Sequence, residues 1–173
     1  YLIQNSRKPI VLTGAQKPIG YDTTDSKKNL RDAFTVAASG MSGVLLVFNG
    51  KIIMGTRARK TRSKSFEAFS SINYPIVGMV QDGRLIQYIR PENSAQTRFY
   101  HELDARVALL KLTPGIECGV LEYLLERSSE VIIESFGVGG LPVYETGSFY
   151  DTIKKGLDDG RTVVLTTQVE NEG

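Results

Sequence analysis

The stretch GVLLVFNGKIIMG, residues 43–55, decides the fold class. Its first part, Gly43–Phe48, is an unbroken apolar run, which predicts a strand buried on both faces, as in a parallel sheet covered by helices. The dipeptide Asn49–Gly50 is typical of a two-residue type I′ turn. The residues KIIM after it are therefore expected to return as the second strand of a hairpin.

Upstream, PIVLT at residues 9–13 predicts another buried strand. Asp25 or Ser26 can cap a helix between the two strands, and Gly40 can end it. Strand, helix and strand in this order predict a right-handed crossover between parallel strands. Helical spacing predicts the buried face of the helix: Leu30, Ala33, Phe34, Ala37 and Ala38.

Other segments of the first half are less regular. Residues 1–6 resemble the last turn of a helix that leads into a strand, and residues 65–70 are expected to form a short helix. Residues 75–80 predict a strand, followed by a tight turn at Asp82–Gly83 into RLIQYI. Residues 91–106, PENSAQTRFYHELDAR, are polar and irregular, which is typical of a linker.

The second half repeats the strand–helix alternation. Strands are expected at residues 107–112, 131–136 and 162–167, and helices at 115–127 and 146–159, the last ended by Gly160. The first of these helices is expected to face inward with Val120, Leu121, Leu124 and Leu125. The predicted class is α/β, with a larger parallel-sheet domain in residues 1–90, a linker at 91–106 and a smaller α/β domain in 107–173. Both ends look cut, so a larger protein is expected.

Composition narrows the class of protein. The 173 residues are 41% hydrophobic with a net charge of +2, which favours a globular protein over a disordered chain or a dedicated nucleic-acid binder. No run is long and apolar enough for a membrane span. The single cysteine, Cys118, cannot form an internal disulfide, which fits the cytoplasm. The single histidine, His101, supports no triad, and no Cys/His cluster has metal-ligand spacing.

The stretch GTRARKTRSKSF, residues 55–66, concentrates positive charge. A solvated basic loop would explain it, and a nucleic-acid surface is a weaker alternative because no aromatic residues interleave the cations. A third interpretation is a catalytic lysine whose pKa is lowered by neighbouring cations and burial, with Lys60 best placed. The pattern alone leaves these alternatives open. The cations are Arg57, Arg59, Lys60, Arg62 and Lys64.

Two small-residue loops follow predicted strands. LTGAQ, residues 12–16, lies where strand ends line clefts. FGVGG, residues 136–140, lets backbone approach a ligand closely, but Pro142 occupies the third glycine position of a dinucleotide fingerprint. Each loop can equally be a tight turn.

Taken in order, these pieces resemble the L-asparaginase family, most of all its bacterial cytoplasmic, type I branch. The resemblance rests on KPIVLTGAQKPI, TTDSKKNL, GVLLVFNGKIIMGTRARKTRSKSFEAFSSINYP, LTPGI, ESFGVGGLP and VVLTTQ, which cover nearly the whole chain. It implies hydrolysis of L-asparagine to L-aspartate and ammonia, without metal or cofactor, by two threonines, an aspartate and a lysine. It also implies at least a homodimer, or a homotetramer.

The resemblance assigns roles to specific residues. Lys60 aligns with the catalytic lysine, so the basic cluster would surround a buried general base. Ala15 and Gln16 align with the loop that closes over the substrate amide, and Gly139 and Gly140 with a loop presented to a neighbouring subunit. The family's threonine and aspartate motifs do not occur in these 173 residues, and Gly140 replaces an asparagine of many relatives.

Three alternatives remain beside an asparaginase. One is the asparaginase-like, ammonia-generating subunit of a tRNA-dependent amidotransferase. Another is a non-catalytic amino-acid-binding module. A nucleic-acid-binding role would predict steep salt dependence. No nucleic acid or membrane partner is expected.

Overall fold

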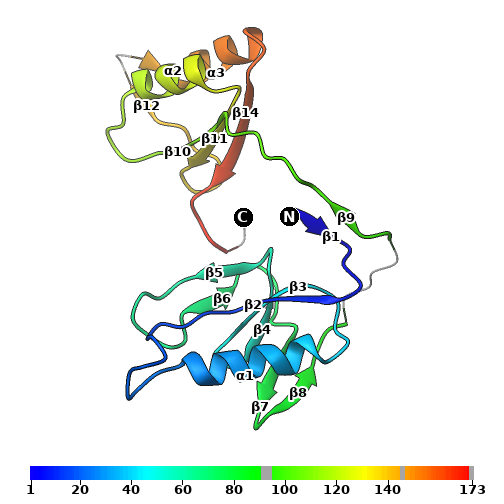
Figure 1. The fold of residues 1–173 in the computed structure, drawn as a ribbon. Helices are drawn as coiled ribbons and strands as arrows, with labels where there is room; N and C mark the ends of the chain where they lie inside the picture. The colour runs from blue at the N-terminus through cyan, green and yellow to red at the C-terminus, as the bar shows by residue number, and fades with distance from the viewer. Residues whose placement is uncertain (91–94, 145–146, 172–173) are drawn as a thin grey trace. The chain divides into compact units, whose positions relative to one another are not determined.

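The structure, a computed structural model, describes residues 1–90, 95–144 and 147–171. The chain divides into two units, Tyr1–His101 and Glu102–Gly173, each with its own sheet and hydrophobic core (Figure 1).

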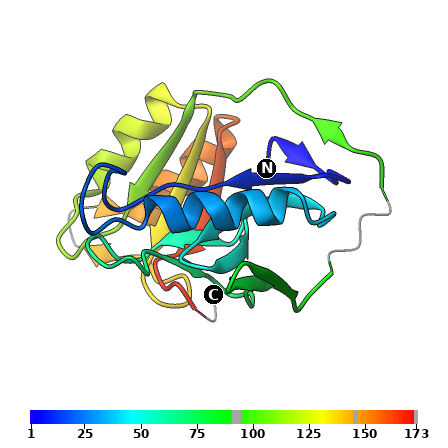
Figure 2. The ribbon, with the colours of Figure 1, turned by 60° about the horizontal axis from the view of Figure 1, so that its bottom comes forward.

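The first unit is built on a five-stranded sheet in the order β2-β3-β4-β7-β8. Strand β2 pairs in parallel with β3, which brings Leu12 beside Leu46, and the remaining pairs are antiparallel. Helix α1, Ser26–Ala37, connects β2 to β3 and packs against both (Figure 2). The strands are β2 Pro9–Leu12, β3 Gly43–Phe48, β4 Lys51–Met54, β7 Gly78–Gln81 and β8 Arg84–Gln87.

The hairpin turns of this sheet form as their sequences predict. Asn49 and Gly50 have φ of 49° and 79°, and Asp82 and Gly83 have 51° and 73°, the left-handed values that type I′ turns require. The core lies between α1 and the sheet. It consists of Ala33, Val36, Met41, Leu45, Val47, Ile52, Val77 and Val80.

Two short ribbons complete the unit. Strands β5, Ala58–Lys60, and β6, Phe69–Ser71, pair antiparallel and join Lys60 to Phe69. Strands β1, Ile3–Gln4, and β9, Arg98–Phe99, also pair antiparallel.

The second unit has a parallel sheet in the order β10-β11-β14. Its helices α2, Cys118–Arg127, and α3, Phe149–Asp158, pack against each other, and Ser148 caps α3 by accepting a hydrogen bond from the Asp151 N–H at 3.1 Å. A small ribbon, β12 Val143–Tyr144 with β13 Gly147–Ser148, precedes α3. The sheet strands are β10 Val107–Lys111, β11 Glu130–Ser135 and β14 Thr162–Thr167.

The α/β class is confirmed, and so are the main strands and helices. Two local predictions are wrong. Residues 65–70 form no helix, because the Thr61 and Arg62 N–H groups bond to the carbonyl of buried Ala68 and draw the segment into the β5–β6 ribbon. Residues 1–6 contain β1 instead of a helical turn, because β9 provides backbone partners. Of the expected linker, 91–94 lie outside the described residues, as does Thr146 of the expected last helix.

The predicted buried face of α1 is also wrong in part. Ala33 is buried, but Leu30 and Phe34 are 46% and 67% exposed. The helix instead turns Asn29, Asp32 and Val36 inward. The rotation follows from polar contacts, because the Asn29 side chain bonds to backbone on two neighbouring loops. In α2, Leu121 and Leu125 are buried as expected, whereas Val120 is 43% exposed.

Candidate active site

The carboxyl ends of the parallel strands β2 and β3 lie at one edge of the first sheet, where α/β proteins place ligands. The loop 13–17 leaves β2 at this edge. Lys60, at the end of β5, lies opposite the loop, and together they enclose a small pocket of about 150 Å³. The pocket is lined by Thr13, Gly14, Ala15, Gln16, Leu46, Phe48, Lys60 and Phe69.

The structure brings together three of the predicted site residues: Lys60, Ala15 and Gln16. The Lys60 Nζ donates to Gln16 Oε1 at 2.8 Å, and Gln16 Nε2 donates to the Ser65 carbonyl at 3.0 Å. The Gln16 amide is thus held at both ends in one orientation. The ammonium group faces a neutral acceptor, so no carboxylate neutralises it through this contact.

The expectation of a buried lysine is wrong, because Lys60 is exposed in this structure. The other cations of residues 57–64 are exposed too, which agrees with the expectation that the outer ones are solvated. Two have defined contacts: Arg57 lies 5.8 Å from the Tyr74 ring centroid, and Arg62 NH1 donates to the Glu67 carbonyl at 3.1 Å.

The walls of the pocket are rigid and partly apolar. The Phe48 and Phe69 rings pack with centroids 5.0 Å apart. Thr13 provides the hydroxyl among the lining residues, and its proton is directed to the Val47 carbonyl at 2.7 Å. This hydroxyl therefore holds the loop to β3. The chemically available groups are the Lys60 amine, the Gln16 amide and the loop backbone.

A buried polar cluster that the sequence interpretation missed lies behind the loop. The Asp25 carboxylate accepts hydrogen bonds from the Gln16 N–H at 2.9 and 3.0 Å and from the Lys17 N–H at 3.1 Å. Asn29, fully buried, donates to Asp25 at 3.0 Å and to the Gly14 carbonyl at 2.9 Å. The signal that could have found it is a carboxylate and an amide one helical turn apart in TTDSKKN, a stretch that otherwise indicates only a helix start.

Hydrogen bonding keeps the Asp25 carboxyl ionised. Burial by itself raises its pKa, but the N–H groups of Gln16 and Lys17 and the Asn29 amide outweigh burial, and the pKa lies below its ordinary value.

Gly139 and Gly140, the remaining predicted residues, belong to the second unit. Gly139 has φ of 103°, and the N–H groups of both glycines bond to the Phe136 carbonyl at 3.0 and 2.7 Å. They form a tight, exposed turn after β11.

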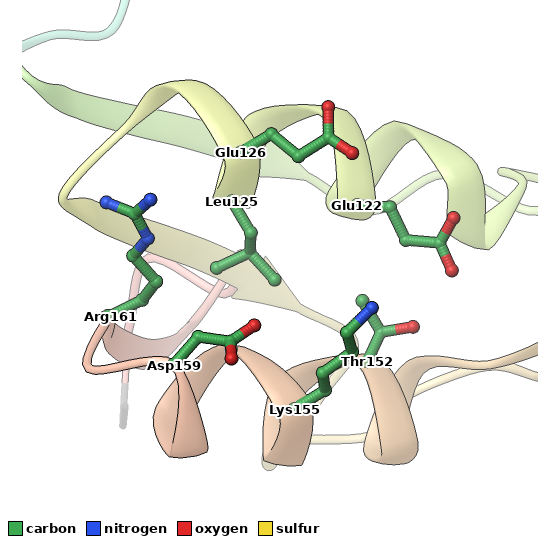
Figure 3. Close-up of a pocket in the computed structure, with 8 residues that line it drawn as sticks. Glu122, Leu125, Glu126, Thr152, Lys155, Asp159 and Arg161 are labelled. Carbon is green, nitrogen blue, oxygen red and sulfur yellow. The ribbon is translucent and has the colours of Figure 1, made fainter.

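A larger groove of about 390 Å³ lies between α2 and α3 of the second unit (Figure 3). Leu125 and Gly156 lie at its base, while Glu122 and Glu126 line the α2 side and Lys155 the α3 side. It contains none of the predicted site residues. Among the described residues, no group of three or more His, Cys, Asp or Glu side chains could hold a metal ion. Within that same part of the chain, no helix has the length and apolarity of a membrane span.

Comparison with known proteins follows the same division of the chain. The family model described as "Asparaginase, N-terminal" matches residues 1–93. The L-asparaginase of Thermococcus kodakarensis is 34% identical over 97% of this chain and 51% of its own length. L-asparaginase 1 of Escherichia coli is 28% identical over 97% of this chain and 50% of its own length. A glutamyl-tRNA(Gln) amidotransferase subunit of Pyrococcus furiosus is 29% identical over 97% and 40%.

The solved structure of the thermostable L-asparaginase from Thermococcus kodakarensis superposes with a TM-score of 0.92, over 99% of this chain and 52% of that one. The chain thus spans about half the length of the asparaginases it matches.

Proposed function

We propose that this chain, which belongs to the asparaginase family, forms part of an enzyme that hydrolyses L-asparagine to L-aspartate and ammonia. In this proposal Lys60 moves protons, Ala15 and Gln16 contact the substrate amide, and no cofactor takes part. The observation that carries the proposal is the contact between Lys60 Nζ and Gln16 Oε1 at 2.8 Å, in a pocket at the sheet edge.

The geometry supports these roles in a simple way. A side-chain amide already accepts a hydrogen bond from Lys60, so the ammonium can bind a carboxamide oxygen. The pocket, at about 150 Å³, suits a small polar group better than a large ligand. Because Lys60 is exposed, its use as a base requires that other groups cover it, and we propose that bound substrate and the rest of the gene product do so.

The proposal extends to organisation. Residues 1–90 would belong to the N-terminal domain and residues 107–173 to the C-terminal α/β domain, joined by residues 91–106. The two separate cores support this division. Gly139 and Gly140 would face a neighbouring subunit of a homodimer or homotetramer. A cytoplasmic location is proposed from the single cysteine, and no nucleic-acid partner from the near-neutral charge of +2.

A second candidate is the ammonia-generating subunit of a tRNA-dependent amidotransferase. The observation that favours it is the similarity to the Pyrococcus furiosus amidotransferase protein over the same residues. The two candidates share the site and differ in whether ammonia is released from free asparagine.

The test is ammonia release from L-asparagine and L-glutamine by the complete gene product. Lys60→Met is expected to lower kcat on asparagine about a thousandfold, as loss of a general acid–base group does, with the fold unchanged by circular dichroism. Lys64→Met is the matched control, because Lys64 belongs to the same exposed cluster but does not line the pocket. Its activity should stay within twofold.

The outcomes separate the candidates. Equal losses in the two variants would contradict the role of Lys60 and return the cluster to a solvated loop. No release from either free amino acid by the unmodified protein would reject the asparaginase and favour the amidotransferase component or a binding module.

A further inference from the structure

We propose that Asp25 is a positioning residue that holds the loop 13–17 so that Gln16 meets Lys60, an inference that rests on the proposed function.

The Asp25 carboxylate has an unusual direction for its position. Asp25 precedes α1, where an aspartate ordinarily accepts a hydrogen bond from the second or third N–H of its own helix. Here it makes no such side-chain cap. Both oxygens instead point at the loop and accept from the Gln16 N–H, and one also accepts from the Lys17 N–H. The residue therefore gives up a helix cap in favour of the loop.

The neighbours of Asp25 hold the same peptide from its other side. The Thr24 and Ser26 hydroxyls both donate to the Lys17 carbonyl, at 2.8 and 2.7 Å. Lys17 thus has its N–H and its carbonyl fixed by three consecutive residues of the TDS sequence. Such a cradle leaves the backbone at Lys17 little freedom to rotate.

Asn29 fixes the beginning of the loop and links it to the sheet. Its Nδ2 donates to the Gly14 carbonyl at 2.9 Å and to Asp25 Oδ2 at 3.0 Å. Its Oδ1 accepts from the Asn49 N–H at 2.9 Å, at the turn after β3. The loop is therefore tied to the carboxyl end of β3 through one buried side chain.

The active-site consequence appears at Gln16. Its backbone N–H is held by Asp25, while its side-chain amide lies between Lys60 Nζ and the Ser65 carbonyl. Release of the backbone would let the amide swing away from Lys60. Misplacement of reacting groups by about 1 Å can reduce rates about a hundredfold, so Asp25 is expected to matter without touching substrate.

Asp25→Asn in the complete gene product tests this. The amide has one acceptor oxygen in place of two, and it turns a donor toward the N–H groups. We expect kcat/KM for asparagine to fall at least tenfold, and hydrogen-exchange protection of the Gln16 and Lys17 amides to fall at least tenfold. Asp32→Asn is the matched control, because Asp32 is an equally buried aspartate of α1 that pairs with Lys28 away from the loop. It should leave both readouts within threefold.

A second variant covers the case in which Asp25→Asn does not fold. Thr24→Val combined with Ser26→Ala removes both hydroxyl donors to the Lys17 carbonyl and keeps the carboxylate. It is expected to lower kcat/KM about tenfold, and Asp25→Glu is expected to retain more activity than Asp25→Asn.

The inference is overturned if Asp25→Asn matches Asp32→Asn in kcat/KM, or if the Gln16 and Lys17 amides stay equally protected. If the unmodified protein hydrolyses neither asparagine nor glutamine, the proposed function fails. The amide protection then still decides whether Asp25 orders the loop.

Discussion

The loop after β2, residues 13–17, and the loop after β11, residues 136–140, both leave the carboxyl end of a parallel strand. Side chains from the start of α1 hold the first loop, chiefly Asp25 and Asn29. The second loop is held mostly by its own backbone. The Gly139 and Gly140 N–H groups bond to the Phe136 carbonyl, and the Phe136 N–H bonds back to Gly140 at 3.1 Å.

The difference shows two ways to shape a ligand-facing loop. The first loop needs no unusual backbone angle, but it depends on side chains 9 to 15 positions later in the chain. The second needs glycines, with φ of 47° at Gly137 and 103° at Gly139. One loop should therefore be sensitive to polar side-chain changes elsewhere, and the other to any Cβ within it.

The largest expected effect is in the first loop, from Asn29→Leu. Asn29 is fully buried, and leucine would leave the Gly14 carbonyl and the Asn49 N–H without their partner. Unsatisfied buried groups cost about 1–3 kcal/mol each, so the free energy of unfolding should fall by about 3 kcal/mol in urea denaturation.

Lys27→Leu, on the exposed side of the same helix, is the control and should stay within about 0.5 kcal/mol. If Asn29→Leu cost no more than this control, the buried cluster would not hold the loop, and the contrast between the two loops would be lost.

The next effect is in the second loop, from Gly139→Ala. A Cβ on Gly139 would meet no atom within 4 Å, so any cost comes from its φ of 103°. Such backbone conformations cost an L-residue about 1–3 kcal/mol. Thermal unfolding should show a loss of about 2 kcal/mol in the second unit.

Gly140→Ala is the matched control for Gly139→Ala. Gly140 does not have a positive φ, and its Cβ would make an ordinary contact with the Phe136 carbonyl oxygen at 3.4 Å. A loss of less than about 0.5 kcal/mol is expected. Equal losses at the two positions would mean that space, and not backbone conformation, sets the cost in this loop.

The same contrast explains what could be predicted from sequence. Apolar runs such as Gly43–Phe48, and the Asn49–Gly50 turn, are local signals, and the structure confirms the elements they predicted. The FGVGG turn is also local, because its glycines announce the backbone angles they permit. The resemblance to a family then selected Lys60 and Gln16, which the structure places in one pocket.

The parts that failed depend on distant partners. Leu30 and Phe34 looked like the buried face of α1, but a hydrophobic pattern gives no weight to the hydrogen bonds of Asn29. Residues 65–70 looked helical until β5 offered a ladder to Phe69. For the same reason, the role of Asp25 toward Gln16 could not be predicted from its position before a helix.

The smallest expected effect is a difference in acid response between the loops. The pKa of the Asp25 carboxyl is lowered in the folded chain, so its stabilising contribution is complete above the ordinary value of 3.8 and is lost as pH falls through the folded-state pKa. Between pH 5 and 7 neither loop should change. Below pH 3.8, hydrogen-exchange protection of the Gln16 and Lys17 amides should fall, relative to unstructured peptides at the same pH.

The Gly139 and Gly140 amides should keep their protection over the same range, because a backbone carbonyl accepts their hydrogen bonds and does not titrate. In Asp25→Asn, the acid response of the first loop should disappear. A parallel fall in both loops would indicate general acid unfolding and would remove the carboxylate as the cause. A fall confined to Gln16 and Lys17 would show that one ionised side chain, placed before α1, sets the order of the loop that faces Lys60.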